Sequence, residues 1–140
     1  MLKSFSFAVL ALFCWGMAPL FGKLGLGGLE PLTALTIRSA VVTGLLALAV
    51  TAGGKWSAVL AAAPRDVLFV ALEGVCAALL GQLAYYYALK YGEVGRVSPV
   101  VSAFPLVALI LAAVFFGEKI TAGKAAGAVL IVAGIILLRY

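Results

Sequence analysis

The chain has 140 residues, of which 66% are hydrophobic and 11% are charged, and its formal net charge is +5. An average soluble domain is about 25% charged, so this composition excludes an ordinary soluble fold and predicts a membrane protein with a single domain, residues 1–140. The sequence has no histidine, and Cys14 and Cys76 lack CxxC spacing, so we expect no metal site, no disulfide framework and no cofactor. The basic residues are scattered singly at the ends of apolar segments, which argues against a nucleic-acid partner.

Five apolar segments of about 20 residues, the length that crosses a bilayer as a helix, follow one another along the chain. They cover residues 4–21, 31–52, 66–89, 97–116 and 122–138. The second begins at Pro31, a favoured first position of a helix, and stops at Gly53. The connectors are short, and the one that contains Trp56 is expected to lie along the membrane interface, where tryptophan prefers headgroup depth. The sequence therefore predicts an all-α, multi-pass bundle of five transmembrane helices.

The basic residues of the connectors divide almost evenly between the two sides of such a bundle. One side carries Lys3, Lys55, Arg65, Lys119 and Lys124, and the other carries Lys23, Lys90, Arg96 and Arg139. Because the Lys/Arg bias sets the orientation of a membrane protein, five against four is almost no bias. This balance favours insertion in both orientations. The alternative is that one dominant connector, which a count does not reveal, fixes a single orientation.

Arg38 lies inside the second segment, which has no acidic residue to neutralise it. It is seven residues, roughly 10 Å, beyond Pro31, and Glu73 lies equally far beyond Asp66 in the third segment. Because the two helices enter from opposite sides, these charges differ in depth within one chain but match in depth between antiparallel copies. A charge in the hydrocarbon usually faces a partner or a wet cavity. We therefore expect Arg38 to meet Glu73 of a second copy, or both to line one vestibule.

A structural reading of the same two residues stays open. Arg38 would then snorkel to the interface and support the fold, and Glu73 would be a polar residue at the wet end of its helix. If Glu73 does carry a proton during transport, the exchange of a cation for protons follows, since both would compete for one carboxylate.

Other side chains are candidates for contact with a solute or with the coupling ion. Ser98, Ser102 and Pro105 recur at i, i+4 and i+7 and so share one helical face. Trp15 is suited to stack on an organic solute, and the third segment contributes Gln82 and Tyr86. For each of these residues, packing is the alternative role.

Two geometric expectations concern the helices themselves. On a straight α-helix Gln82 points about 180° away from Glu73, so both reach one cavity only if the helix bends. Gly123, Gly127 and Gly134 lie on one broad face of the last segment and are expected to allow close helix packing, within the chain or against a second copy.

Several stretches together resemble one half of an EamA-type member of the drug/metabolite transporter superfamily. They are "FCWGMAPLFGKLGL", "PLTALTIRSAVV", "YYYALKYGEVGRVSPVVSAFPLVALILAAVFFGEKIT" and "GKAAGAVLIVAGIILL", in this order and over nearly the whole chain. The resemblance implies a secondary transporter that moves a small organic metabolite or drug by alternating access, in the inner membrane of a cell. Most members carry two inverted five-helix halves, so a single half implies completion by an antiparallel homodimer.

The sequence offers no nucleophile–base set, so an enzyme is not expected. The expected partners are the lipid bilayer, a second copy of the chain and a small-molecule substrate. The rival function is a non-transporting membrane subunit, or an accessory or assembly protein, that uses the same helix bundle. Solute flux by the purified protein would separate the two.

Overall fold

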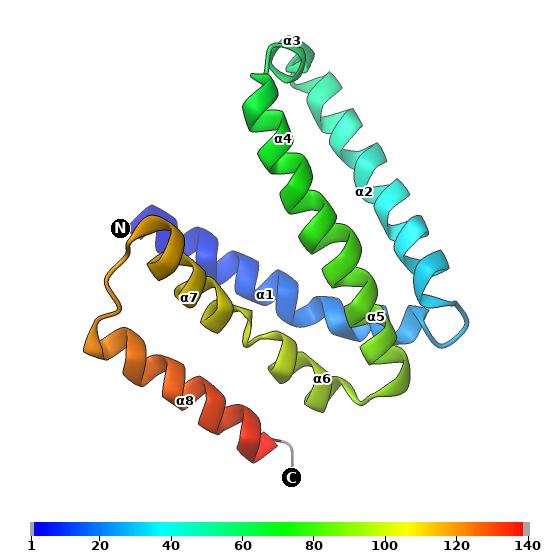
Figure 1. Ribbon diagram of the computed structural model, residues 1–140. Helices are drawn as coiled ribbons and strands as arrows, with labels where there is room; N and C mark the ends of the chain where they lie inside the picture. Colours follow the sequence, from blue (N-terminus) through cyan, green and yellow to red (C-terminus); the bar gives the residue numbers. More distant parts are fainter. Residues whose placement is uncertain (1, 139–140) are drawn as a thin grey trace. The chain divides into compact units, whose positions relative to one another are not determined.

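The computed structural model describes residues 2–138, with side chains from residue 3 onward; Arg139, counted above among the basic residues, lies outside the described residues. The chain falls into two units, Met1–Tyr91 and Gly92–Tyr140. The first unit consists of α1 (Leu2–Gly25), α2 (Pro31–Ala52), α3 (Trp56–Leu60), α4 (Pro64–Glu73), the π-helix η1 (Gly74–Gly81) and α5 (Gln82–Tyr91). The second consists of α6 (Val94–Val101), α7 (Phe104–Phe116) and α8 (Ala122–Leu138) (Figure 1).

The helices confirm the predicted all-α class for residues 2–138, where no strand occurs. Four helical stretches are long and apolar enough to cross a membrane, and they are Lys3–Gly25, Pro31–Ala52, Pro64–Tyr91 and Val94–Phe116. By helix length and composition, the chain is a multi-pass membrane protein. α8 is apolar but has only 17 residues, near the lower limit of about 17 for a spanning helix. Its role as a fifth crossing stays a prediction.

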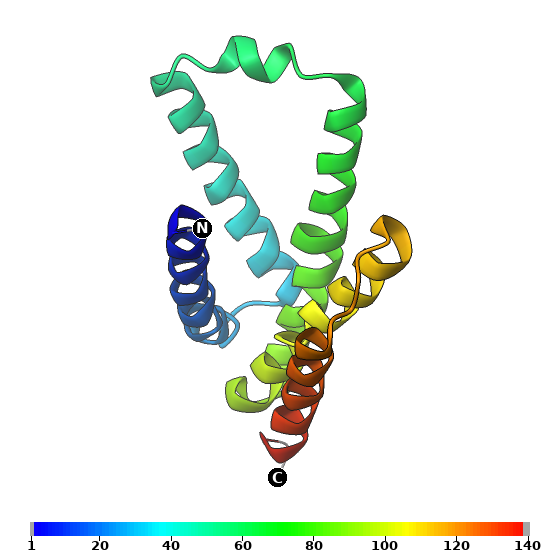
Figure 2. The same cartoon turned by 90° about the vertical axis from the view of Figure 1, so that its left-hand side faces the viewer.

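The long helices of the first unit meet at one end only. Figures 1 and 2 show α2 and α4 apart over most of their length, with α3 connecting their far ends. At the near end, α5 contacts both α1 and α2. We call this region, where the end of α1, the start of α2 and α5 come together, the helix junction.

The helix junction holds the buried hydrophobic side chains of the described residues. They are Leu26, Leu35, Tyr86 and Leu89, and Leu89 is 0% exposed. Gly22 faces α5 at the place where α1 approaches it, and a Cβ at this position would make ordinary contacts, 3.5 Å from Leu89 Cδ1 and 3.7 Å from Tyr86 Cε1. Helices in lipid associate through such packing around small residues, because lipid is as apolar as the helix surfaces.

Two lysine side chains join the helix ends at the junction. The ammonium of Lys23 donates a hydrogen bond of 2.6 Å to the carbonyl oxygen of Leu89, and that of Lys90 donates one of 2.8 Å to the carbonyl oxygen of Leu29. Leu89 is in the last turn of α5, where carbonyl groups lack partners within the helix and lysine side chains satisfy them well, and Leu29 is in the connector between α1 and α2. The pair therefore works as a lysine clamp between the α1–α2 connector and the end of α5.

Replacing Lys90 with methionine is expected to lower the free energy of unfolding by about 1–2 kcal/mol, the usual contribution of a hydrogen bond from a charged donor. Methionine keeps an unbranched apolar stem, so the packing of the stem is largely retained. The measurement is unfolding in mixed detergent and dodecyl sulfate micelles. Lys55→Met is the control, since the Lys55 ammonium has no hydrogen-bond partner among the described residues. Equal stability of the two variants would contradict a role for the clamp.

The third apolar segment is longer than expected and is not a uniform α-helix. It runs without a break from Pro64 to Tyr91, through α4, η1 and α5. The π register is visible at its end, where the backbone N–H of Gln82 donates to the carbonyl oxygen of Ala77, five residues earlier. π-Helices are rare, and those that occur are often at functional sites. The sequence "GVCAALLG" carries no signal that distinguishes it from an α-helix.

In the second unit, the fourth apolar segment is interrupted between α6 and α7. Pro105 has no N–H to donate to the preceding turn, so the chain closes shorter turns instead. The N–H of Ala103 donates to the carbonyl oxygen of Val100 (3.2 Å), and that of Leu106 donates to the carbonyl oxygen of Ala103 (2.9 Å). α6 begins at Val94, three residues before the predicted start, and it contacts α8.

Candidate functional site

The eight predicted solute or coupling residues divide between the two units. Trp15, Arg38, Glu73, Gln82 and Tyr86 belong to the first unit, and Ser98, Ser102 and Pro105 belong to the second. Each group is therefore a candidate site within its own unit.

Arg38 lies on the face of α2 that is turned toward the junction. Pro31, Leu35 and Arg38 recur at i, i+4 and i+7 and share one face of the helix, and Pro31 and Leu35 are buried. The Arg38 side chain itself is exposed, and it has no ion-pair or hydrogen-bond partner among residues 3–138. A permanently charged guanidinium inside a 22-residue apolar helix is therefore left without compensation in this chain.

Gln82 lies on the matching face of α5. Gln82, Tyr86 and Leu89 share one face by the same spacing, and Tyr86 and Leu89 are buried in the junction, at 9% and 0% exposure. Arg38 is seven residues beyond the start of α2 and Gln82 is eight residues before Lys90, so both lie roughly 10–12 Å from the lysine clamp. The structure thus brings Arg38 and Gln82 to a similar distance from the clamp on two helices that contact each other, an arrangement that the sequence did not predict.

Glu73 lies farther from the junction, at the last position of α4. It is nine residues before Gln82, on the order of 10 Å along the helix axis. Its side chain is exposed, and among the described residues it has no ion-pair partner. The structure shows no bond between Arg38 and Glu73 within the chain, and their meeting across two copies stays a prediction.

The two aromatic candidates have different surroundings. Trp15 is 68% exposed on α1, where its indole is accessible to lipid, a solute or a second copy of the chain. Tyr86 packs beside Gly22 in the junction, so its surroundings fit the packing role that was the alternative for it. Its place there makes Tyr86 a support for Gln82, one turn away on the same helix.

In the second unit, the three candidates surround the interruption between α6 and α7. Ser98 is half-buried inside α6, Ser102 directly follows the last residue of α6, and Pro105 is in the first turn of α7. Interrupted helices with free backbone groups are common at the solute sites of transporters. Because the helix is interrupted between α6 and α7, the shared helical face expected for these three residues stays a prediction.

The glycine face of α8 is not tightly covered within the chain. A Cβ added at Gly123, Gly127 or Gly134 would meet no atom within 4 Å. Gly22 is the glycine that faces side chains of a neighbouring helix, those of Leu89 and Tyr86, and sequence reasoning missed it because a single glycine before a lysine reads as a helix end. Packing of the α8 glycines against a second copy stays a prediction.

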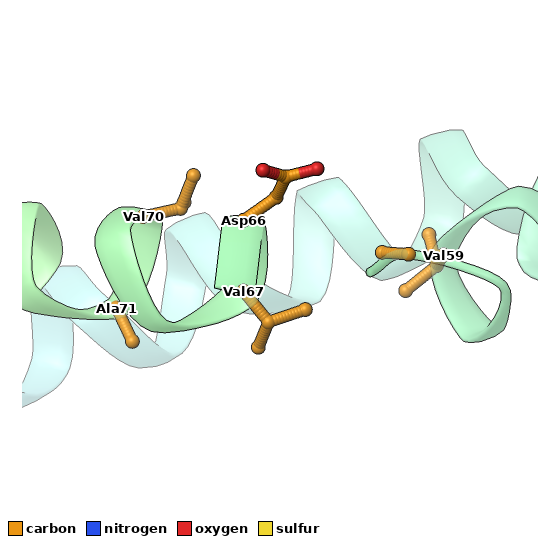
Figure 3. Close-up of a pocket in the computed structure, with 6 residues that line it drawn as sticks. Val59, Asp66, Val67, Val70 and Ala71 are labelled. Atoms are coloured by element: carbon orange, nitrogen blue, oxygen red, sulfur yellow. The ribbon is translucent and has the colours of Figure 1, made fainter. Parts of the chain in front are cut away.

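A shallow pocket of about 470 Å³ lies between α3 and the first turns of α4 (Figure 3). It is lined by Val59, Ala62, Asp66, Val67, Val70 and Ala71. Figure 3 shows Asp66 and Val70 extending to one side of α4, and Val67 and Ala71 to the other. None of the predicted solute residues lines this pocket, and its only polar side chain is that of Asp66.

Comparisons with known proteins identify the family. The sequence profile of the EamA-like transporter family matches residues 2–140. The chain belongs to this family. The family assignment confirms the resemblance found in the sequence and supports a general role in transport across a membrane.

Three individual proteins are also similar to this chain, and two of them are named as transporters. The chain is 32% identical over 122 residues to an uncharacterized transporter encoded in the cobO 3′ region of Sinorhizobium sp, which covers 87% of this chain and 86% of the relative. It is 29% identical over 130 residues to an uncharacterized transporter of Archaeoglobus fulgidus, which covers 89% of this chain but 43% of that protein. An uncharacterized protein of Methanocaldococcus jannaschii is 36% identical over 74 residues, covering 53% of this chain and 54% of the relative. No solved structure matches the chain.

Proposed function

We propose that this protein is a secondary carrier that moves a small organic metabolite or drug across the inner membrane by alternating access. The carrier is an antiparallel homodimer, in which the two copies are inserted in opposite orientations. The observation that carries the proposal is the pair of uncompensated charges, Arg38 and Glu73, on apolar spans of opposite direction. Charges at mid-membrane are costly and usually mark a pathway or a partner.

An antiparallel second copy would supply what one chain lacks. A residue that lies near one surface of the membrane in one copy lies near the other surface in an inverted copy. Arg38 of one copy is then near the depth of Glu73 of the other. The even division of basic residues between the connectors supports both orientations. The match to less than half of the Archaeoglobus fulgidus relative is compatible with a carrier that uses two such units, as transporters with inverted repeats do.

The orientation of the chain tests the dimer. Single cysteines are placed at Gly27 or at Lys55 in a Cys14→Ser, Cys76→Ala background, and intact cells are labelled with a membrane-impermeant thiol reagent. We expect each position to label in about half of the molecules, as equal populations of the two orientations require. Labelling at only one of the two connectors would contradict the antiparallel dimer.

Flux tests the transport function separately. Proteoliposomes are loaded with a mixture of small organic cations, anions and zwitterions, and mass spectrometry reports which solutes leave faster than from protein-free vesicles. At least one solute is expected to show protein-dependent, saturable efflux. If no solute does so, and the protein copurifies with an unrelated membrane protein, the accessory-subunit function replaces the carrier.

A further inference from the structure

The π-helix η1 determines which face of the third span Glu73 occupies. Each residue of an α-helix turns the chain by about 100°, whereas each residue of a π-helix, with its i→i+5 hydrogen bond, turns it by about 85°. Seven π steps within η1 and one α step at each end then add up to roughly 795° from Glu73 to Gln82, two full turns plus about 75°. An uninterrupted α-helix would separate the same two side chains by about 180°. The π register therefore brings Glu73 to the Gln82 side of the helix.

That side is the inner face of the first unit. Gln82 shares its face with Tyr86 and Leu89, which are buried in the junction. Arg38 shares the facing surface of α2 with the buried residues Pro31 and Leu35. In the π register, Arg38, Gln82 and Glu73 are thus turned to the side on which α2 and the α4–α5 stretch face each other.

The two ends of this stretch differ in how firmly they are held. α5 is fixed by the junction and by the lysine clamp, whereas α4 has no buried residue. A change of register in η1 would therefore turn α4, and Glu73 with it, while α5 stays in place. The rotation would be about 105°, the difference between the two separations above.

A glycine favours the π register at its junction end. A Cβ added at Gly81 would lie 3.0 Å from the carbonyl oxygen of Cys76, five residues earlier, so in this register that carbonyl group would have to move by a few tenths of an ångström. A Cβ added at Gly74, at the other end of η1, would meet no atom within 4 Å. α-Helices accept alanine at every interior position, so alanine at position 81 should favour the α register and alanine at position 74 should be neutral.

We propose that η1 is a register switch, in which the π form turns Glu73 inward with Arg38 and Gln82 and the α form turns it to the opposite face. As a step of transport the switch rests on the proposed function, since it would carry the Glu73 carboxyl between two environments. A carboxylate that faces hydrocarbon is costly, so the outward form requires a protonated carboxyl or a cationic partner. The other charged groups concerned are Arg38 on α2, Lys23 at the end of α1, and Arg65 and Asp66 at the start of α4.

The register is read by distances between pairs of spin labels in nanodiscs. One label replaces Ala49, which lies eighteen residues, or five full turns, after Pro31 on the inner face of α2. The second label replaces Val70 or Ala71, which Figure 3 shows on opposite sides of α4. In the π register Val70 lies within about 15° of the Gln82 direction, whereas in the α register Ala71 lies within about 20° of it.

In the parent protein we expect the 49–70 distance to be shorter than the 49–71 distance, by about 5 Å given the width of a helix. Gly81→Ala is expected to reverse this order, and the matched control Gly74→Ala to retain it. The same order in all three proteins would overturn the proposal. If Gly81→Ala does not fold, Glu73→Gln replaces it: without the charge, α4 is expected to populate both registers and to add a second, longer 49–70 distance, and a single unchanged distance would overturn the proposal.

These distances do not depend on transport. If Gly81→Ala reverses the order of the two distances but no vesicle assay detects solute flux, the register switch is supported and the carrier function is contradicted. If solute flux is detected but the order of the two distances is the same in all variants, the carrier function is supported and the register switch is contradicted.

Discussion

Replacing Arg38 with glutamine is expected to reduce the initial rate of solute flux by about tenfold or more, while the chain still inserts and remains helical. A charged donor typically contributes about 1.5–3 kcal/mol to a hydrogen bond, and each 1.36 kcal/mol is a factor of ten in rate. Glutamine keeps the hydrogen-bonding character and removes the charge. Flux is measured in proteoliposomes with the solute identified for the parent protein.

A charge exchange separates pairing of Arg38 with Glu73 across two copies from separate roles of the two residues. Arg38→Glu and Glu73→Arg alone each place like charges together in the antiparallel dimer, so each is expected to lower the dimer fraction. The double variant restores opposite charges and should recover the dimer. Arg65→Glu is the control, because Arg65 lies in the first turn of α4, at the end of its span, where it is 5.9 Å from the centre of the Phe69 ring. Single variants that dimerise and transport like the parent would contradict the paired model.

Leu89→Ala is expected to have the largest effect on stability of any single truncation in the first unit. Leu89 is fully buried, it faces Gly22 on α1, and its carbonyl oxygen accepts the Lys23 hydrogen bond. Truncation of a buried leucine in soluble proteins costs about 2–5 kcal/mol. In lipid the loss is mainly one of packing contacts, so we expect about 2 kcal/mol, near the lower end of that range.

The control for this truncation is Leu45→Ala, since Leu45 is 62% exposed on α2. Unfolding in mixed micelles is followed by circular dichroism and by the reactivity of a cysteine placed at Leu26. If the cysteine at position 26 becomes reactive in Leu89→Ala but stays unreactive in Leu45→Ala, the loss of stability arises in the junction. Equal stability of the two variants would show that the junction does not hold the unit together.

The sequence predicts helices well where clear punctuation marks their ends. Pro31 and Gly53 bracket α2, whose bounds match the predicted 31–52, and α8 matches the predicted 122–138. The short helix α3, which begins at Trp56, lies in the connector that was expected to run along the membrane interface. The fourth segment begins earlier than expected, at Val94, because a polar start without proline or a capping side chain leaves the boundary undefined.

The candidate site was predictable in its charges but not in its geometry. Arg38 and Glu73 stand out because ionisable residues are rare in apolar spans. The helix face that Glu73 occupies could not be derived from the sequence. The prediction assumed a turn of 100° per residue, and each residue of η1 turns the chain by a smaller angle. The lysine clamp was also missed: Lys23 and Lys90 read as connector charges, and only the fold shows that each reaches a backbone carbonyl of a segment far along the chain.

The lysine clamp also has a consequence for the order of events during synthesis. Lys23 and the carbonyl group that it binds are 66 residues apart in the chain, and α2 through α5 lie between them. At a translation rate of roughly 5–20 residues per second, the ribosome needs about 3–13 seconds to produce the partner after Lys23 has been made. During this time the first two spans must wait in the bilayer or the translocon with the ammonium group bound to water or lipid phosphate. The nascent chain can therefore close its first unit only after the third span has been inserted.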